Sequence, residues 1–66
     1  MIKKEMKQWL HDRGLTALQV AERAEVPIPR DVWRMFSGNI PVSMPVLNVL
    51  RGVYGMTEKE TKEVLP

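Results

Sequence analysis

Cysteine is absent from this chain of 66 residues, and histidine, tyrosine and phenylalanine each occur once. Without cysteine, neither a disulfide framework nor a thiolate metal site can compensate for a small core. The single histidine, His11, excludes a zinc site assembled from the usual ligands. The sequence therefore predicts one domain over residues 1–66, held together by apolar packing, with no metal and no cofactor.

Long hydrophobic runs are also missing. No apolar stretch approaches the roughly 20 residues that span a bilayer, and no signal-peptide segment follows the start. We therefore expect a soluble, cytoplasmic protein that makes no membrane contact. A chain this short buries only about 60% of its unfolded surface, and small helical domains often gain buried area by pairing, which favours a homodimer.

Catalytic constellations are missing as well. His11 and Asp12 are adjacent and so point to different sides of a helix. The sequence contains no Ser/His/Asp set, no glycine-rich phosphate loop and no paired-carboxylate cleft. We expect neither enzymatic activity nor a small-molecule ligand.

The charges are unevenly distributed along the chain. Ten Lys and Arg residues stand against eight Asp and Glu, a net charge of +2, and residues 1–51 hold eight of the basic and five of the acidic residues. The excess of basic residues in 1–51 is compatible with a polyanionic partner. A solvated surface of mixed charge gives similar numbers of basic and acidic residues, so this alternative stays open.

Apolar residues recur at helical spacing along the whole chain, and no strand-like alternation occurs. The sequence therefore predicts an all-α domain of five short helices. Thr16 and Ser43 are expected N-caps, and Thr57 with Glu60 forms a capping-box pattern. The expected helices cover residues 2–13, 16–24, 29–37, 43–54 and 57–65, with stops at Gly14, Gly38 and Gly55.

The second and third helices are joined by Glu25-Val26-Pro27-Ile28-Pro29. The two prolines forbid helix continuation and bias the residues before them toward extended backbone, so they stiffen the turn. Two short helices joined this tightly must cross at a steep angle. This is the outline of a helix-turn-helix.

Several short motifs occur in a recognisable order: G-L-T at 14–16, V-A at 20–21, S-G at 37–38 and Y-G at 54–55, with leucines between the last two. In this order, over almost the whole chain, they resemble the lambda-repressor-like, or Cro/C1-type, helix-turn-helix family. The resemblance implies a five-helix DNA-binding module similar to phage Cro-type regulators. It implies a sequence-specific transcriptional regulator or repressor whose third helix lies in the major groove of double-stranded DNA, bound as a dimer to a palindromic operator.

The chain departs from the family pattern in the turn and at the second helix. Glu25 stands where the family usually has glycine, and the interval from Val26 to Gly38 is one residue longer than usual. Ala17 replaces the glutamine that commonly contacts phosphate, so Gln19 is the nearest substitute. The prolines of the turn replace the usual polar start of the third helix.

The outward residues of the third helix are expected to contact bases, because its apolar positions belong to the core. Arg30 or Arg34 suits a bidentate contact with guanine O6 and N7. Asp31 could accept a hydrogen bond from cytosine N4. Alternatively, it forms a solvated ion pair with Arg34. Trp33 either covers the DNA side or rolls into the bundle or a dimer contact, and the need for burial in so small a chain favours the second.

Contacts with phosphates are expected from the starts of the second and fourth helices and from basic side chains such as Lys7, Arg13 and Arg23. Near these helix starts lie Thr16, Gln19, Asn39 and Ser43. An alternative is that Thr16 and Ser43 serve only as helix caps.

A second function remains open: the helix-turn-helix could serve protein contact, as in an antitoxin, excisionase or adaptor module. The residues expected to dock on such a partner are Leu18, Ile28, Trp33, Val42 and Met56. Apolar residues at the end of the fourth helix and in the fifth helix, which are not assigned to the core, suggest a dimer seam. These residues are Val53, Met56, Val64 and Leu65.

Overall fold

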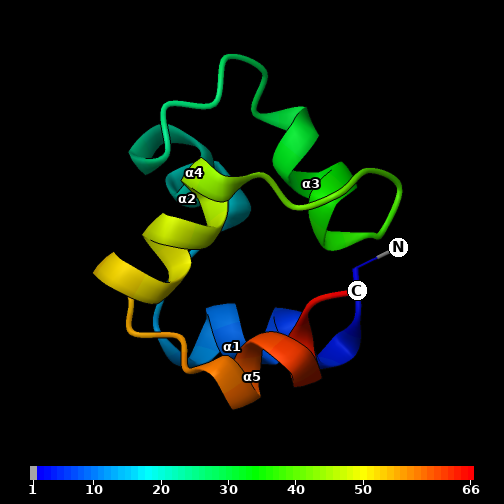
Figure 1. Ribbon diagram of the computed structural model, residues 1–66, viewed down its shortest axis with the longest axis vertical. Coiled ribbons are helices and arrows are strands. Elements are labelled where there is room, and N and C mark those ends of the chain that lie inside the picture. Colours follow the sequence, from blue (N-terminus) through cyan, green and yellow to red (C-terminus); the bar gives the residue numbers. More distant parts are fainter. Residues whose placement is uncertain (1) are drawn as a thin grey trace.

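The computed structural model describes residues 2–66, and this part of the chain forms helices and no strand. The all-α architecture with five short helices is confirmed. The elements are α1 (Lys4–Asp12), α2 (Ala17–Arg23), α3 (Arg30–Phe36), α4 (Met44–Asn48), a π-helical continuation η1 (Val49–Val53), and α5 (Glu58–Val64). In Figure 1, α2 and α3 occupy the upper half of the molecule, and α1 and α5 lie side by side below them.

Two capping boxes fix the starts of α2 and α5. The hydroxyl of Thr16 accepts a hydrogen bond from the Gln19 backbone N–H at 3.2 Å. The side-chain oxygen of Gln19, Oε1, accepts one from the Thr16 backbone N–H at 2.8 Å. Thr57 and Glu60 repeat the arrangement with distances of 3.1 and 3.0 Å. The predicted caps at Thr16 and Thr57 are therefore confirmed, and each capping box satisfies two backbone N–H groups that the helix itself leaves unpaired.

Ser43 occupies the predicted position before α4, but its side chain does not cap the helix. Its hydroxyl donates to the Met35 sulfur at 3.8 Å instead. An N-cap oxygen accepts from the second or third residue of the helix, and the second residue here is Pro45, which has no N–H. The predicted N-cap position of Ser43 is confirmed, but the expected side-chain cap is absent, although Val46 at the third position keeps an N–H.

Helices α1, α2 and α3 end in the same hydrogen-bond pattern, the Schellman motif. In α1, Gly14 N–H donates to His11 O and Leu15 N–H donates to Leu10 O. The residue at the turning point of each motif has a positive φ: Gly14 (+65°), Glu25 (+56°) and Gly38 (+83°). The predicted helix ends at the glycines are confirmed. The turn after α2 has the same left-handed backbone conformation, but at Glu25 rather than at a glycine.

The fourth helix differs from its prediction because it widens into a π-helix after Asn48. Tyr54 N–H donates to Val49 O, five residues back, at 3.2 Å. Gly52 lies in this stretch, where a residue with weak helix preference lowers the cost of departing from α-geometry. α1 also begins at Lys4 rather than at residue 2, although Ile2 is buried before it.

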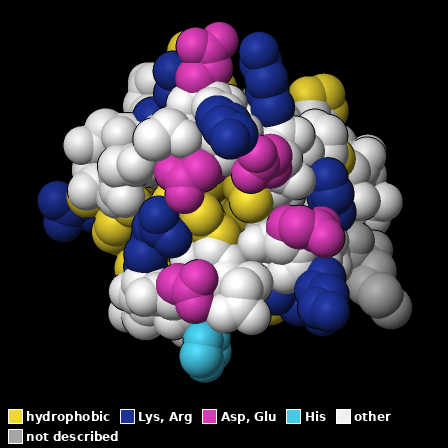
Figure 2. Space-filling model, turned by 90° about the horizontal axis from the view of Figure 1, so that it is seen from below, with side chains coloured by type: hydrophobic (Ala, Val, Ile, Leu, Met, Phe, Trp, Pro, Cys, Tyr) yellow, Lys and Arg dark blue, Asp and Glu magenta, His cyan; other side chains and the backbone are white. Residues whose placement is uncertain are grey.

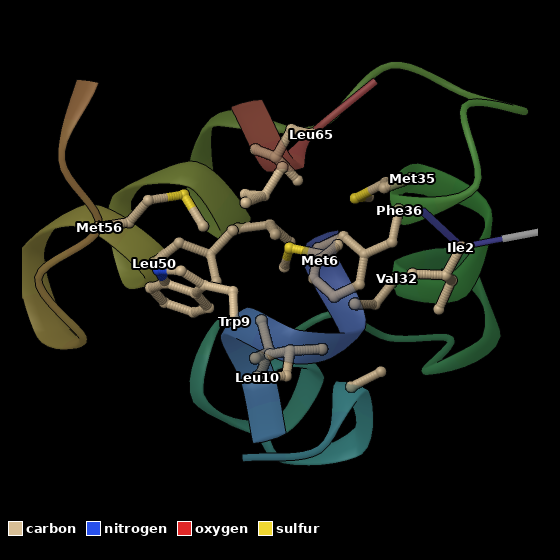
Figure 3. Packing of buried hydrophobic residues seen from close by; sticks show 14 of the residues in the cluster. Ile2, Met6, Trp9, Leu10, Val32, Met35, Phe36, Leu50, Met56 and Leu65 are labelled. Atoms are coloured by element: carbon tan, nitrogen blue, oxygen red, sulfur yellow. The ribbon is translucent and has the colours of Figure 1, made fainter. Parts of the chain in front are cut away.

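One apolar core receives side chains from every helix (Figure 3). Phe36, Met6 and Leu50 are the largest of its fully buried side chains, and they come from α3, α1 and η1. The prediction that Trp9 belongs to the core is confirmed. α2 packs against α3 and η1, and α1 packs against α5, so the core holds all the helices in one body.

Candidate nucleic-acid interface

Helix α3 has one buried face and one outward face. Val32, Met35 and Phe36 are buried because these positions share one side of a helix with about 3.6 residues per turn. Arg30 and Arg34 lie one turn apart on the opposite side and are exposed. The core therefore fixes the rotation of α3 about its axis, and both guanidinium groups extend into solvent.

Asp31 lies beside the second of these arginines. Arg34 Nη1 is 3.9 Å from Asp31 Oδ1, and the Arg34 side chain remains 58% exposed. An exposed pair at this distance contributes only about 0 to 1 kcal/mol, so little free energy holds Arg34 to its partner. The Arg34 guanidinium can leave Asp31 for a ligand at small cost.

Trp33 is not part of the bundle interior, so burial in the bundle was a wrong prediction, whereas burial in a dimer contact stays a prediction. Its side chain is 50% exposed, because the other apolar residues of α3 already fill the inward positions. It lines a groove of about 330 Å³ between α3, α1 and the start of α2, together with Thr16, Lys7 and His11. The structure thus brings two predicted site residues, Thr16 and Trp33, to one groove.

His11 is a functional candidate that sequence reasoning missed. It follows Lys7 by four residues on α1, and both side chains are exposed at the same groove. The i, i+4 spacing places them on one face of the helix, which was the available signal.

Gln19 is anchored by the capping box at the start of α2. Its side-chain oxygen accepts from the Thr16 backbone, which leaves the amide nitrogen as a donor that has no partner within residues 2–66. Thr16 and Gln19 therefore both cap the helix, and Gln19 also keeps a donor for an outside acceptor.

Asn39 and Ser43 lie apart from this groove. Asn39 N–H donates to Arg34 O at 2.9 Å and closes the C-terminal end of α3, where Asn39 lines a second groove with Pro66. Ser43 is half-buried against Met35. The structure does not bring these two predicted residues to Trp33.

The face formed by α1 and α5 carries both signs of charge in alternation (Figure 2). Arg13, expected as a phosphate contact, stacks on the Trp9 ring at 3.9 Å and pairs with Glu60 at 3.2 Å. Glu60 Oε2 also accepts from Trp9 Nε1 at 3.1 Å. The pKa of Glu60 is lowered, mainly by the hydrogen bond from the Thr57 backbone N–H and to a smaller extent by Trp9 and Arg13. Burial acts in the opposite direction but does not cancel this effect. This cluster joins α5 to α1, so Arg13 serves the fold there.

Of the apolar residues assigned to docking and to a dimer seam, half are exposed, namely Leu18, Ile28, Trp33 and Val53, and the others are covered. Met56, Val64 and Leu65 are buried in the core, and Val42 is half-buried against it. Val64 and Leu65 are covered because α5 packs on α1. The proposed seam was therefore wrong at three of its four positions, and only Val53 is exposed.

Residues 2–66 contain no group of three or more histidine or acidic side chains placed to hold a metal ion. Within the same range, no helix has both the length and the apolar character needed to cross a membrane. Comparisons of the chain with protein-family models, with curated proteins and with solved structures give no match. The function is therefore inferred from the side chains described above.

Proposed function

We propose that this protein is a sequence-specific double-stranded DNA-binding transcription regulator with a lambda-repressor-like helix-turn-helix fold, in which α3 lies in the major groove. The observation that carries the proposal is the outward face of α3. Arg30 and Arg34 are exposed one turn apart on a helix whose other side is buried in the core. A helix held in this way can enter a groove of about 12 Å width without rearrangement.

The guanidinium groups supply the base contacts in this proposal. A bidentate bond from arginine to guanine O6 and N7 contributes about 1 to 3 kcal/mol of discrimination against other bases. Asp31, released from Arg34, would accept from cytosine N4 on the opposite strand. Together these groups favour a G·C pair at the centre of the contact.

The groups around α3 supply the phosphate contacts. Lys7 on α1 and the free amide of Gln19 on α2 have no acceptor among residues 2–66, so both would be available to donate to phosphates. Such contacts fix the register of a protein on the duplex but carry no sequence information directly. A single small module covers only about 600 to 1,000 Å² of its own surface on DNA, which favours a homodimer on a palindromic operator.

The proposal is tested by selection of duplexes from a randomised DNA library with the purified protein. We expect one enriched sequence with inverted half-sites, and a steep loss of affinity between about 50 and 200 mM salt because bound phosphates release counterions. A library that remains random, with binding insensitive to salt, contradicts the proposal.

A protein-contact function is the second candidate, because three apolar side chains on or between α2 and α3 are exposed. Leu18 and Trp33 are 50% exposed, and Ile28 is 57% exposed. Large exposed apolar side chains can mark a protein contact when they form one patch. The same selection distinguishes the two functions, because a protein-contact module enriches no DNA sequence.

A further inference from the structure

The groove beside Trp33 differs from the groove on the α1–α5 face. Its floor is apolar, formed by Leu10 and Ala17, which are almost fully covered by neighbouring side chains. No acidic residue lines it, and its polar rim consists of Lys7, His11 and Thr16. The groove between α1 and α5 is instead lined by Glu5, Asp12, Glu60 and Glu63 among its charged residues. Charge therefore favours an anionic occupant at the Trp33 groove and disfavours one at the other.

The occupant must also offer an apolar surface, because the exposed residue Trp33 and the apolar floor both line the groove. A DNA strand has this combination, since each phosphate is flanked by a deoxyribose whose C2′ carries only hydrogen. An RNA strand carries a 2′-hydroxyl at the same place, and burying it without a partner costs free energy.

The position of the groove matches the path of such a strand. Trp33 lies between Arg30 and Arg34 in sequence and projects from the side of α3 that faces α1. A helix in the major groove lies between two phosphate backbones, so one backbone passes beside its flank. We propose that the Trp33 groove binds one deoxyribose of that backbone against the indole, with the adjoining phosphate at Lys7, and so selects DNA over RNA. This inference rests on the proposed function and adds the chemistry of its backbone contact.

The test places single ribonucleotides, one position at a time, in the duplex that the wild-type protein selects. We expect one position in each half-site where the added 2′-hydroxyl weakens binding several-fold, and we expect W33A to be insensitive to that substitution. W33A should also bind every duplex about tenfold more weakly with an unchanged salt slope, because an uncharged stacking contact is removed. K7A should instead lower the salt slope by about one unit. W33F, which retains an aromatic face, should recover much of the affinity.

Lys59 provides the control, because it is exposed on α5 and does not line the groove. K59A should bind DNA with the affinity and salt slope of the wild type. Trp33 fluorescence gives an independent readout: acrylamide should quench it in the free protein and less so on DNA, whereas buried Trp9 should be shielded in both states.

Each other outcome overturns the inference in a recognisable way. If no ribonucleotide position depends on Trp33 while R34A still loses base preference, the DNA-binding function stands and the deoxyribose contact does not exist. If W33A changes the elution of the free protein to a smaller species, the groove holds a second copy of the chain. If the wild type binds no duplex, the proposed function fails together with the inference.

Discussion

Glu25 is the residue at which the backbone between α2 and α3 is strained. It occupies the turning point of a Schellman motif with φ +56°, where α1 and α3 have glycine. A non-glycine residue in this region costs about 1 to 2 kcal/mol through the clash of its Cβ with the following carbonyl. The turn is stable because Val26, the next residue, donates to Ala21 O at 2.9 Å and packs against the core.

Replacing Glu25 with glycine should therefore stabilise the protein. We expect E25G to raise the free energy of unfolding by about 0.5 to 1 kcal/mol, because the removed strain exceeds the added flexibility of the unfolded chain. Urea denaturation measures the change. Glu22, an exposed glutamate inside α2, is the matched control, and E22G should lower stability by about 1 kcal/mol. A loss of stability in E25G would show that Glu25 is not strained.

Trp33 illustrates what single residues in the sequence could not predict. Its exposure depends on the rotation of α3, and that rotation is decided by three neighbours that together fill the inward side. The small size of the chain favoured burial of its tryptophans, and this holds for Trp9 but not for Trp33. The spacing of apolar residues correctly predicted which side chains of α3 point inward. It did not predict which residues lie next to the side chains that point outward.

At the scale of elements, α5 is fastened to α1 through Glu60. One carboxylate oxygen accepts from the Thr57 backbone, and the other accepts from Trp9 and Arg13. All of these contacts favour the ionised form, and the pKa of Glu60 lies below its ordinary value of 4.5. A carboxylate with a lowered pKa in the folded state stabilises that state above its unfolded pKa, and the contribution is lost as pH falls through the lowered value.

The stability of the wild type should therefore decline below pH 4.5 partly through Glu60. E60Q keeps the capping geometry but cannot ionise, so its own contribution should not change with pH in this window. The measurement is the free energy of unfolding of both proteins from pH 6 to pH 3, followed by Trp9 fluorescence. E63Q, at an exposed carboxylate on the same helix, is the control and should follow the wild type. Equal acid sensitivity of E60Q and wild type would refute the role of Glu60.

Two glycines give opposite predictions for the same substitution. A Cβ on Gly38 would meet Pro66 Cβ at 3.2 Å, at a φ of +83°, so G38A should destabilise the protein by about 1 kcal/mol or more. A Cβ on Gly52 meets no atom within 4 Å, and G52A should stabilise η1 by up to about 1 kcal/mol. Thermal unfolding of both variants tests the pair, and a shift of the same sign in both would be inconsistent with this packing.

Helix positions and ends were predictable to within a residue or two because they depend on local signals: apolar spacing, capping pairs and glycine stops. The π-helix was not predictable. Its first two residues, Val49 and Leu50, are buried, and the only sequence signal there, Gly52, indicated a weak helix rather than a π-helix. The burial of Val64 and Leu65 follows from the packing of α5 on α1, a contact between distant parts of the chain.

At the scale of the whole molecule, one small core supports every surface feature described above. Natural domains have about 0.05 to 0.15 kcal/mol of stability per residue, or about 3 to 10 kcal/mol for a chain of this length. Truncation of a buried phenylalanine costs about 3 to 5 kcal/mol, and Phe36 is fully buried at the centre of the cluster. F36A should therefore be largely unfolded at 37 °C by circular dichroism. W33A, at the exposed position three residues earlier on α3, should remain folded.

The whole-molecule arrangement also separates the two kinds of basic residue. Every lysine lies within residues 3–7 or 59–62, in or next to α1 and α5, whereas the basic residues of α2, α3 and η1 are all arginines; Arg13, at the end of α1, is the exception. Arginine offers the planar pair of donors that matches guanine, so this separation agrees with a base-contacting role for α3. The sequence indicated the arginines, but only the core showed that they face outward together.

The most direct test of this account is the DNA sequence preferred by R34A compared with that of the wild type. Selection from the same randomised duplex library should give R34A an enriched sequence that has lost its preference at one base pair in each half-site. R51A, which removes an exposed arginine on η1, should enrich the wild-type sequence. If R34A and R30A both enrich the wild-type sequence unchanged, the arginines of α3 do not contact bases and the proposed function is contradicted.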